Sequence, residues 1–342
     1  MASTTAPSDV GWSRVVEWLE RHQIPMYLLA LVVGGVIGLA APDSAPTMER
    51  VINPTLGLLL FATFLGVPFA TIATSMKDVR FVGGVVALNF VIVPVVVFGL
   101  TRFIASDQAL LIGALLTLLC PCVDYVMVFT KIAGGSSERL LAVAPLLMIL
   151  QMLLLPLYLF VFVGSELSDI IEIDPFVEAL AFLILIPLAL AAITQRVART
   201  RQFARSVMSI AQQAMVPLMM AVLVVVVGSQ ISKVKSDLDS LFGVAAIYAA
   251  FLIVMAPIGL ALSRRLGLDP PGRRALTFSG ATRNSLVVLP LALALPAQYA
   301  IAAVAVVTQT LVELVGMVIY VRVVPRLTPN HEPAVPLLIS HE

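Results

Sequence analysis

Three ionisable side chains interrupt long apolar stretches of the sequence: Asp124, Arg283 and Glu313. An ionisable group at the centre of a membrane helix costs about 2.5–3.5 kcal/mol, so it persists where it pairs or lines a wet cavity. No basic residue is predicted close to Glu313, and burial of a carboxyl penalises its charged form. We therefore predict that Glu313 binds and releases a proton, the structural alternative being a hydrogen bond to a neighbouring helix. Gln309 precedes it by four residues and makes the same helical face polar.

The two cysteines are the next residues with characteristic chemistry. Cys120 and Cys122 flank Pro121 in an apolar stretch. Thiolates suit soft metal centres. The alternative is that a buried cysteine acts as a small hydrophobic residue. The spacing alone favours the second interpretation and leaves a binding role open for both cysteines.

The composition shows what surrounds these residues. Of 342 residues, 60% are hydrophobic and 12% are charged, against about 25% charged in an ordinary soluble domain. The net charge of +1 gives no electrostatic footprint for nucleic acid. All three histidines lie in polar segments, which leaves no usual set of metal ligands in the apolar part. These features predict a polytopic membrane protein with no cofactor.

A membrane-spanning helix needs about 20 mostly apolar residues, and by this criterion the sequence predicts ten transmembrane helices. The predicted spans are 25–41, 53–75, 81–103, 109–132, 139–164, 176–195, 209–231, 241–262, 273–296 and 298–324. With both termini in the cytoplasm, sixteen of the 21 Lys and Arg residues lie inside and Arg283 lies within a span. The other four lie outside: Arg50, Arg102, Lys233 and Lys235. This positive-inside bias supports the orientation.

The predicted spans divide into two sets of five, which enter the membrane in opposite orientations. Because five is an odd number, the second set begins on the opposite side of the membrane, which is the pattern of an inverted repeat, common in secondary transporters. We predict a cytoplasmic N-terminal segment (1–24), a first repeat (25–164), an external linker (165–175), a second repeat (176–324) and a cytoplasmic tail (325–342). The fourth span of each repeat is interrupted, at Pro121 and again over 279–285. Corresponding interruptions point to a binding site near the midplane.

Three motifs suggest a family: Pro121-Cys122 in the fourth span, Asn89-Phe90 with Pro94 in the third, and Leu311-Val312-Glu313 in the tenth. The chain resembles the arsenite efflux permeases of the arsenical-resistance type, which belong to the bile acid:sodium symporter superfamily. The resemblance covers nearly the whole chain. It implies panel and core domains with broken helices four and nine that cross near the midplane, and proton-driven export of arsenite, sometimes antimonite.

Two features depart from that family's pattern. Asp124 follows Cys122 and Val123, and Ser279 and Arg283 stand where sodium-coupled relatives carry oxygen ligands. An arginine offers only donors, so it cannot ligate a cation. We predict that the Arg283 guanidinium is a built-in cation in the sodium position and pairs with Asp124. The alternative places the two side chains in separate aqueous vestibules.

The predicted substrate site comprises Cys122, Arg283, Asn284 and Glu313. The resemblance implies that Cys122 binds arsenic(III), a soft, thiol-seeking species that a single thiol would bind reversibly. The supporting polar residues are Asn89, Thr282, Ser285 and Gln309. The predicted function is exchange of arsenite for protons across a cell membrane, with a prokaryotic plasma membrane favoured by the short loops. The alternative is transport of a small organic anion whose carboxylate contacts Arg283. An intramembrane enzyme is disfavoured because no nucleophile–base pair is recognisable.

Overall fold

The described part of the computed structural model is helical, as the apolar composition requires of a chain in lipid. It covers residues 18–19, 21–66, 78–123, 125–164, 180–234 and 238–329. Within these ranges, the extended pairing is limited to an isolated antiparallel bridge between Pro121 and Arg283. The predicted terminal segments and external linker lie largely or wholly outside the described residues, as do Asp124, Lys77 and Lys235.

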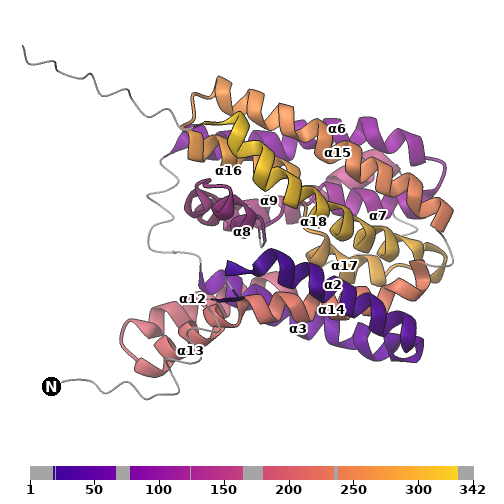
Figure 1. The fold of residues 1–342 in the computed structure, drawn as a ribbon, viewed down its shortest axis with the longest axis horizontal. Helices are drawn as coiled ribbons and strands as arrows, with labels where there is room; N and C mark the ends of the chain where they lie inside the picture. Colours follow the sequence, from indigo (N-terminus) through magenta and orange to yellow (C-terminus); the bar gives the residue numbers. More distant parts are fainter. Residues whose placement is uncertain are drawn as a thin grey trace, which may run out of the picture.

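The helices pack as two layers, which lie one above the other in Figure 1. The first layer contains α2 (Gln23–Ala40), α3 (Ala45–Leu65), α12 (Ile186–Ala198), α13 (Gln202–Gln213) and α14 (Met215–Val234). The second contains α5 (Val79–Ala87), α6 (Val93–Thr101), α7 (Gln108–Leu118), α8 (Tyr125–Ile132), α9 (Ser137–Val163), α15 (Leu238–Arg265), α16 (Pro270–Ala281), α17 (Ser285–Leu293) and α18 (Ile301–Leu327). Each layer draws on both halves of the chain, so contacts distant in sequence hold it together.

The first layer depends on a close approach of α2 and α14. A Cβ atom at Gly38 would lie 2.3 Å from the carbonyl oxygen of Gly228, and one at Gly34 would lie 2.7 Å from that of Val224. Gly35 faces away, with nothing within 4 Å of its Cβ position. Small residues spaced by four let membrane helices touch backbone to backbone. The Gly34–Gly38 spacing therefore sets how closely α2 packs on α14.

A π-helical turn over Leu88–Ile92 joins α5 to α6 in the second layer. Pro94 has no N–H, so the carbonyl of Phe90, four residues earlier, loses its usual helical donor. The Tyr158 hydroxyl on α9 donates to this oxygen at 2.6 Å. Asn89 lies in the same turn and is buried. The turn thus contains a buried polar side chain within an otherwise apolar helix, and π turns are frequent at functional sites.

Four helices are long and apolar enough to cross a membrane, and there are up to six such spans if each of two bent pairs counts as one, within the described residues. Helices overlap all ten predicted ranges. The range 53–75 differs most, because its helix begins at Ala45. The polar first turns of this helix include Glu49, which accepts a hydrogen bond from Gln230 of α14 at 3.0 Å. Hydropathy alone misses a helix start whose polar groups are paired within the protein.

Candidate functional site

The two predicted interruptions meet in the second layer. α7 ends at Leu118 and α8 begins at Tyr125, while α16 ends at Ala281 and α17 begins at Ser285. Between them, the N–H of Asn284 donates to the Cys120 carbonyl at 2.8 Å, and that of Cys122 donates to the Thr282 carbonyl at 3.3 Å. Each break therefore supplies hydrogen-bond partners that the other lacks. We call these two unwound segments, 119–123 and 282–284, the crossing.

Local sequence explains why the helices stop here. Pro121 lacks an N–H and disfavours helical geometry in the residue before it, so α7 cannot continue. On the other side, the Asn284 side chain accepts a hydrogen bond from the N–H of Val287 at 3.2 Å. Such an N-cap defines the first turn of α17. Both breaks therefore arise from residues within the two unwound segments themselves, Pro121 in one and Asn284 in the other.

Arg283 projects from the crossing into a cluster of oxygen atoms and is 0% exposed. Its Nη2 lies 2.7 Å from Asn89 Oδ1, 2.7 Å from the Ser279 carbonyl and 2.9 Å from the Gly280 carbonyl. Its Nη1 lies 3.4 Å from the Leu118 carbonyl. The three carbonyls belong to the last turns of α16 and α7, where helix dipoles place partial negative charge. Oxygen atoms thus occupy the two terminal nitrogens of the guanidinium, while its Nε has no hydrogen-bond partner among the described residues.

Glu313 of α18 closes the other side of the crossing and is 1% exposed. Its Oε2 accepts from the backbone N–H of Arg283 at 2.8 Å and from the Gln309 amide. Its Oε1 accepts from the Tyr125 hydroxyl at 2.6 Å. Each of these donors stabilises the ionised carboxylate and opposes the cost of burying it. The carboxyl predicted to lack a basic neighbour is therefore partnered by three donors, one of them the backbone of Arg283.

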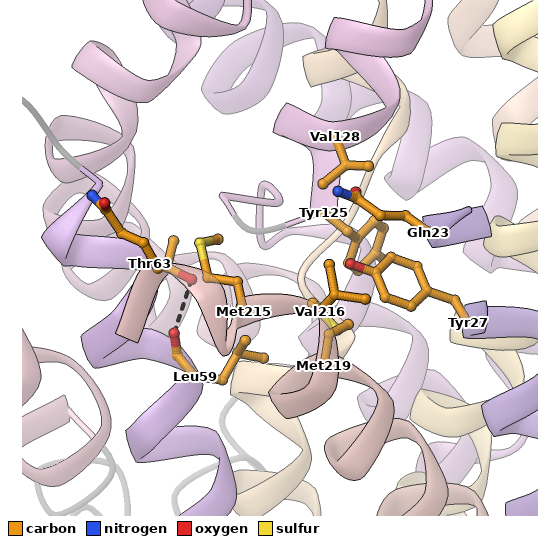
Figure 2. A pocket seen from close by; sticks show the side chains of 10 residues that line it. Gln23, Tyr27, Leu59, Thr63, Tyr125, Val128, Met215, Val216 and Met219 are labelled. Atoms are coloured by element: carbon orange, nitrogen blue, oxygen red, sulfur yellow. Dashed lines mark hydrogen bonds between the residues drawn. The ribbon is translucent and has the colours of Figure 1, made fainter. Parts of the chain in front are cut away.

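A cavity of about 80 Å³ lies between the layers. Figure 2 shows its side chains converging from α2, α3, α8 and α14, with Tyr27 and Tyr125 on one side and Thr63 on the other. Further lining residues include Gln23, Gln212, Met215 and Met219. None of the described residues around this inter-layer cavity carries a charge. Five of the ten lining residues carry hydroxyl or amide groups and the other five are aliphatic or thioether side chains, which could hold a small uncharged solute.

The model of the SBF-like CPA transporter family matches residues 25–326. The chain belongs to this family. The match supports the bile acid:sodium symporter-like superfamily and assigns the chain to membrane transporters. No curated protein matches the chain in a sequence comparison.

In this SBF-like transporter, most of the predicted site residues lie around the crossing. The Asn89 amide joins the Arg283 guanidinium to the Ser279 hydroxyl, to which it donates at 3.0 Å. Thr282 donates to the Phe278 carbonyl at 2.8 Å, and the hydroxyls of Ser285 and Thr310 lie 2.6 Å apart. Asp124 lies outside the described residues, so its predicted pairing with Arg283 stays a prediction.

The transporter separates the predicted binding residues from the cavity. Cys122, Arg283 and Asn284 are each at most 1% exposed, and none of them is among the residues that line the inter-layer cavity. Sequence reasoning did not find Tyr27 or Tyr125, which do line it. A single aromatic residue in an apolar span carries no distinguishing signal, because its neighbours come from other helices.

Proposed function

We propose that this protein is a proton-coupled secondary transporter that exports arsenite. The placement of Glu313 carries the proposal. Its carboxylate binds the backbone of the crossing through Arg283 and binds Tyr125, a residue of the cavity wall. A carboxyl in this position changes its hydrogen bonds to both when it gains a proton, which is what coupling requires.

The proposed architecture is that of ten spans in two inverted five-helix repeats, 25–164 and 176–324. In this arrangement the first layer corresponds to the panel domain and the second to the core domain. The broken pairs α7–α8 and α16–α17 correspond to helices four and nine. Their antiparallel meeting at Pro121 and Arg283 supports this assignment. Movement of one layer against the other would open the cavity alternately to the two sides.

The position of Arg283 at the crossing favours the proton over sodium as the coupling ion. Arg283 already fills the oxygen cluster around Asn89, Ser279 and Gly280 with a permanent positive charge. A sodium ion at the same oxygens would meet that charge at short range. Proton exchange at Glu313 therefore accounts for coupling without sodium.

The uncharged cavity supports arsenite as the substrate. Arsenous acid is neutral near neutral pH and presents hydroxyl groups that hydrogen-bond with amides and hydroxyls such as those of Gln23 and Thr63. Arg283 is sequestered by carbonyl oxygens, so it does not oppose a neutral substrate. We assign the thiol of Cys122, buried at the crossing, as the arsenic(III) ligand in the transport state that exposes it.

One observation favours the second candidate, a small organic anion. An open surface hollow of about 410 Å³ between α12 and α13 is lined by Arg199 and Arg205. Gln212 lines both this cavity and the inter-layer cavity. Arginines beside a substrate path raise the local concentration of anions. This arrangement would suit a carboxylate that enters past α13.

The deciding experiment is arsenite accumulation in everted membrane vesicles, energised by a pH gradient in sodium-free buffer. We expect accumulation by the wild type and its loss in Glu313→Gln. Glu49→Gln is the matched control, because it makes the same change at a carboxylate of α3 that is bonded to Gln230. Absence of accumulation by a folded wild type contradicts arsenite export, and proton-driven uptake of a carboxylate would then support the second candidate.

The cysteines provide a separate test of the substrate. Cys122→Ser should lower the rate of arsenite exchange at least tenfold, whereas Cys120→Ser, an equally buried neighbour, should retain it. Equal rates in both variants and the wild type would show that no thiol takes part.

A further inference from the structure

The Tyr125 hydroxyl stands between two acceptors that belong to different parts of the site. It lies 2.6 Å from Glu313 Oε1 and 3.1 Å from the carbonyl oxygen of Arg283. A hydroxyl carries one proton, so it donates fully to only one of these oxygens at a time. The shorter distance shows that Glu313 is the preferred acceptor in this structure.

The other carboxylate oxygen leaves no room for an incoming proton. Glu313 Oε2 accepts from the Arg283 backbone N–H at 2.8 Å and from the Gln309 amide. The backbone N–H is fixed by the crossing and cannot turn away. With Oε2 occupied by these two donors in this structure, we place the incoming proton on Oε1, the oxygen that faces Tyr125.

We propose that Tyr125 is a positioning residue that transmits the protonation state of Glu313 to the crossing and to the inter-layer cavity. When a hydronium ion of the solvent gives up a proton, its O–H bond breaks, the Oε1–H bond forms, and Glu313 becomes the donor toward the Tyr125 oxygen. The Tyr125 O–H then turns to the Arg283 carbonyl, its second acceptor. When the proton returns to water, the Oε1–H bond breaks and both hydrogen bonds reverse.

The position of Tyr125 makes this reversal consequential. Arg283, whose carbonyl receives the redirected hydroxyl, is paired with Pro121 across the crossing. The Tyr125 side chain also lines the inter-layer cavity and is 3% exposed. Tyr125 is the first residue of α8, directly after the first break. One hydrogen bond therefore connects proton binding to the wall of the cavity and to the backbone that joins the two broken helices.

The other ionisable groups near Glu313 keep their roles through this change. Arg283 stays bound to its oxygen cluster, and Cys120 and Cys122 belong to the other unwound segment of the crossing, the one that follows α7. Tyr320 on α18 donates to the Leu252 carbonyl. Asp124 lies outside the described residues. Helices α2, α7 and α17 carry no acidic or basic residue over their described lengths. On α8, α14, α15 and α16 such residues lie at or near helix ends: Lys131, Lys233, Asp239, Arg264, Arg265, Arg273 and Arg274.

The test needs no substrate: infrared difference spectra between low and high pH, recorded on the full-length protein in lipid. The wild type should show a tyrosine signal that appears together with a protonated carboxyl signal. Glu313→Gln should remove both, and Tyr125→Phe should remove the tyrosine signal while the carboxyl signal stays. Tyr27→Phe is the matched control, since Tyr27 lines the same cavity at 3% exposure. It should leave both signals unchanged.

A transport measurement complements the spectra. Because this inference rests on the proposed proton coupling, Tyr125→Phe should lower the proton-driven accumulation ratio at least tenfold while downhill exchange continues. A tyrosine signal that survives in Glu313→Gln overturns the inference, and that comparison holds even if Tyr125→Phe does not fold. An accumulation ratio in Tyr125→Phe equal to that of the wild type also overturns it. Absence of arsenite accumulation by the wild type, with the spectra as expected, would instead contradict the proposed function alone.

Discussion

Replacing Arg283 with glutamine tests whether the guanidinium acts as a resident cation. The change removes a charge that is 0% exposed and leaves Asn89 Oδ1 and the carbonyls of Ser279 and Gly280, each now within 2.9 Å of Nη2, without their donor. Each buried acceptor left unpaired costs about 1–3 kcal/mol. We expect a loss of that size in Arg283→Gln when sodium is absent.

The vacated oxygens should then accept a free cation. Carbonyl and amide oxygens are ligands for hard cations. Sodium at a hundred times its dissociation constant would restore about 2.7 kcal/mol by binding the folded state alone. The wild type, already filled by its own guanidinium, should gain nothing beyond the effect of ionic strength. Sodium would thus rescue the variant and leave the parent unchanged.

The chain carries a built-in probe for this measurement. Cys120 and Cys122 are its two cysteines, and both are at most 1% exposed at the crossing. A thiol-reactive dye during slow heating reports when the crossing opens, with choline chloride as the matched salt. An Arg283→Gln protein that opens at the wild-type temperature and ignores sodium would refute the resident-cation idea.

Two further pairs of variants test packing in each layer. Gly38→Ala should destabilise the protein by about 1–3 kcal/mol through overpacking against Gly228. Gly35→Ala, with open space at its Cβ, should be neutral or slightly stabilising. Equal unfolding temperatures of the two variants would contradict the close approach of α2 and α14. Arg274→Gln should cost about 1–3 kcal/mol for each buried acceptor left unpaired, because its side chain is 7% exposed and bonded to neighbouring loop oxygens. Arg139→Gln, whose partly exposed ion pairs lie at the same end of the layer, should cost about 0–1 kcal/mol; thermal unfolding of the purified variants compares the two.

Short-range features of the site could be predicted from the sequence. Pro121 and the polar stretch around Asn284 indicate interruptions by their own backbone chemistry, and the structure has unwound segments at both. The same holds for Gln309 and Glu313, which share a helical face because they are four residues apart and which hydrogen-bond to each other. In these cases the neighbours in space are also neighbours in sequence.

Partners distant in sequence could not be predicted. Asn89 and Arg283 are 194 residues apart, and Tyr125 and Glu313 are 188 apart. The predicted lack of a basic partner for Glu313 counted charged side chains and overlooked the backbone N–H of Arg283, which any residue at that position except proline would offer. The inter-layer cavity is also formed by four or more helices, so no single span carries its pattern.

The crossing has a consequence for how such a transporter can change its substrate. The two unwound segments are joined through main-chain atoms, the Asn284 N–H to the Cys120 carbonyl and the Cys122 N–H to the Thr282 carbonyl. These bonds do not depend on which side chains the four residues carry. The side chains of Cys120, Cys122 and Thr282 can therefore be exchanged while these two bonds persist. A scaffold of this kind allows recognition to diversify without a redesign of the fold, because the parts that select a solute are separate from the parts that hold the helices together.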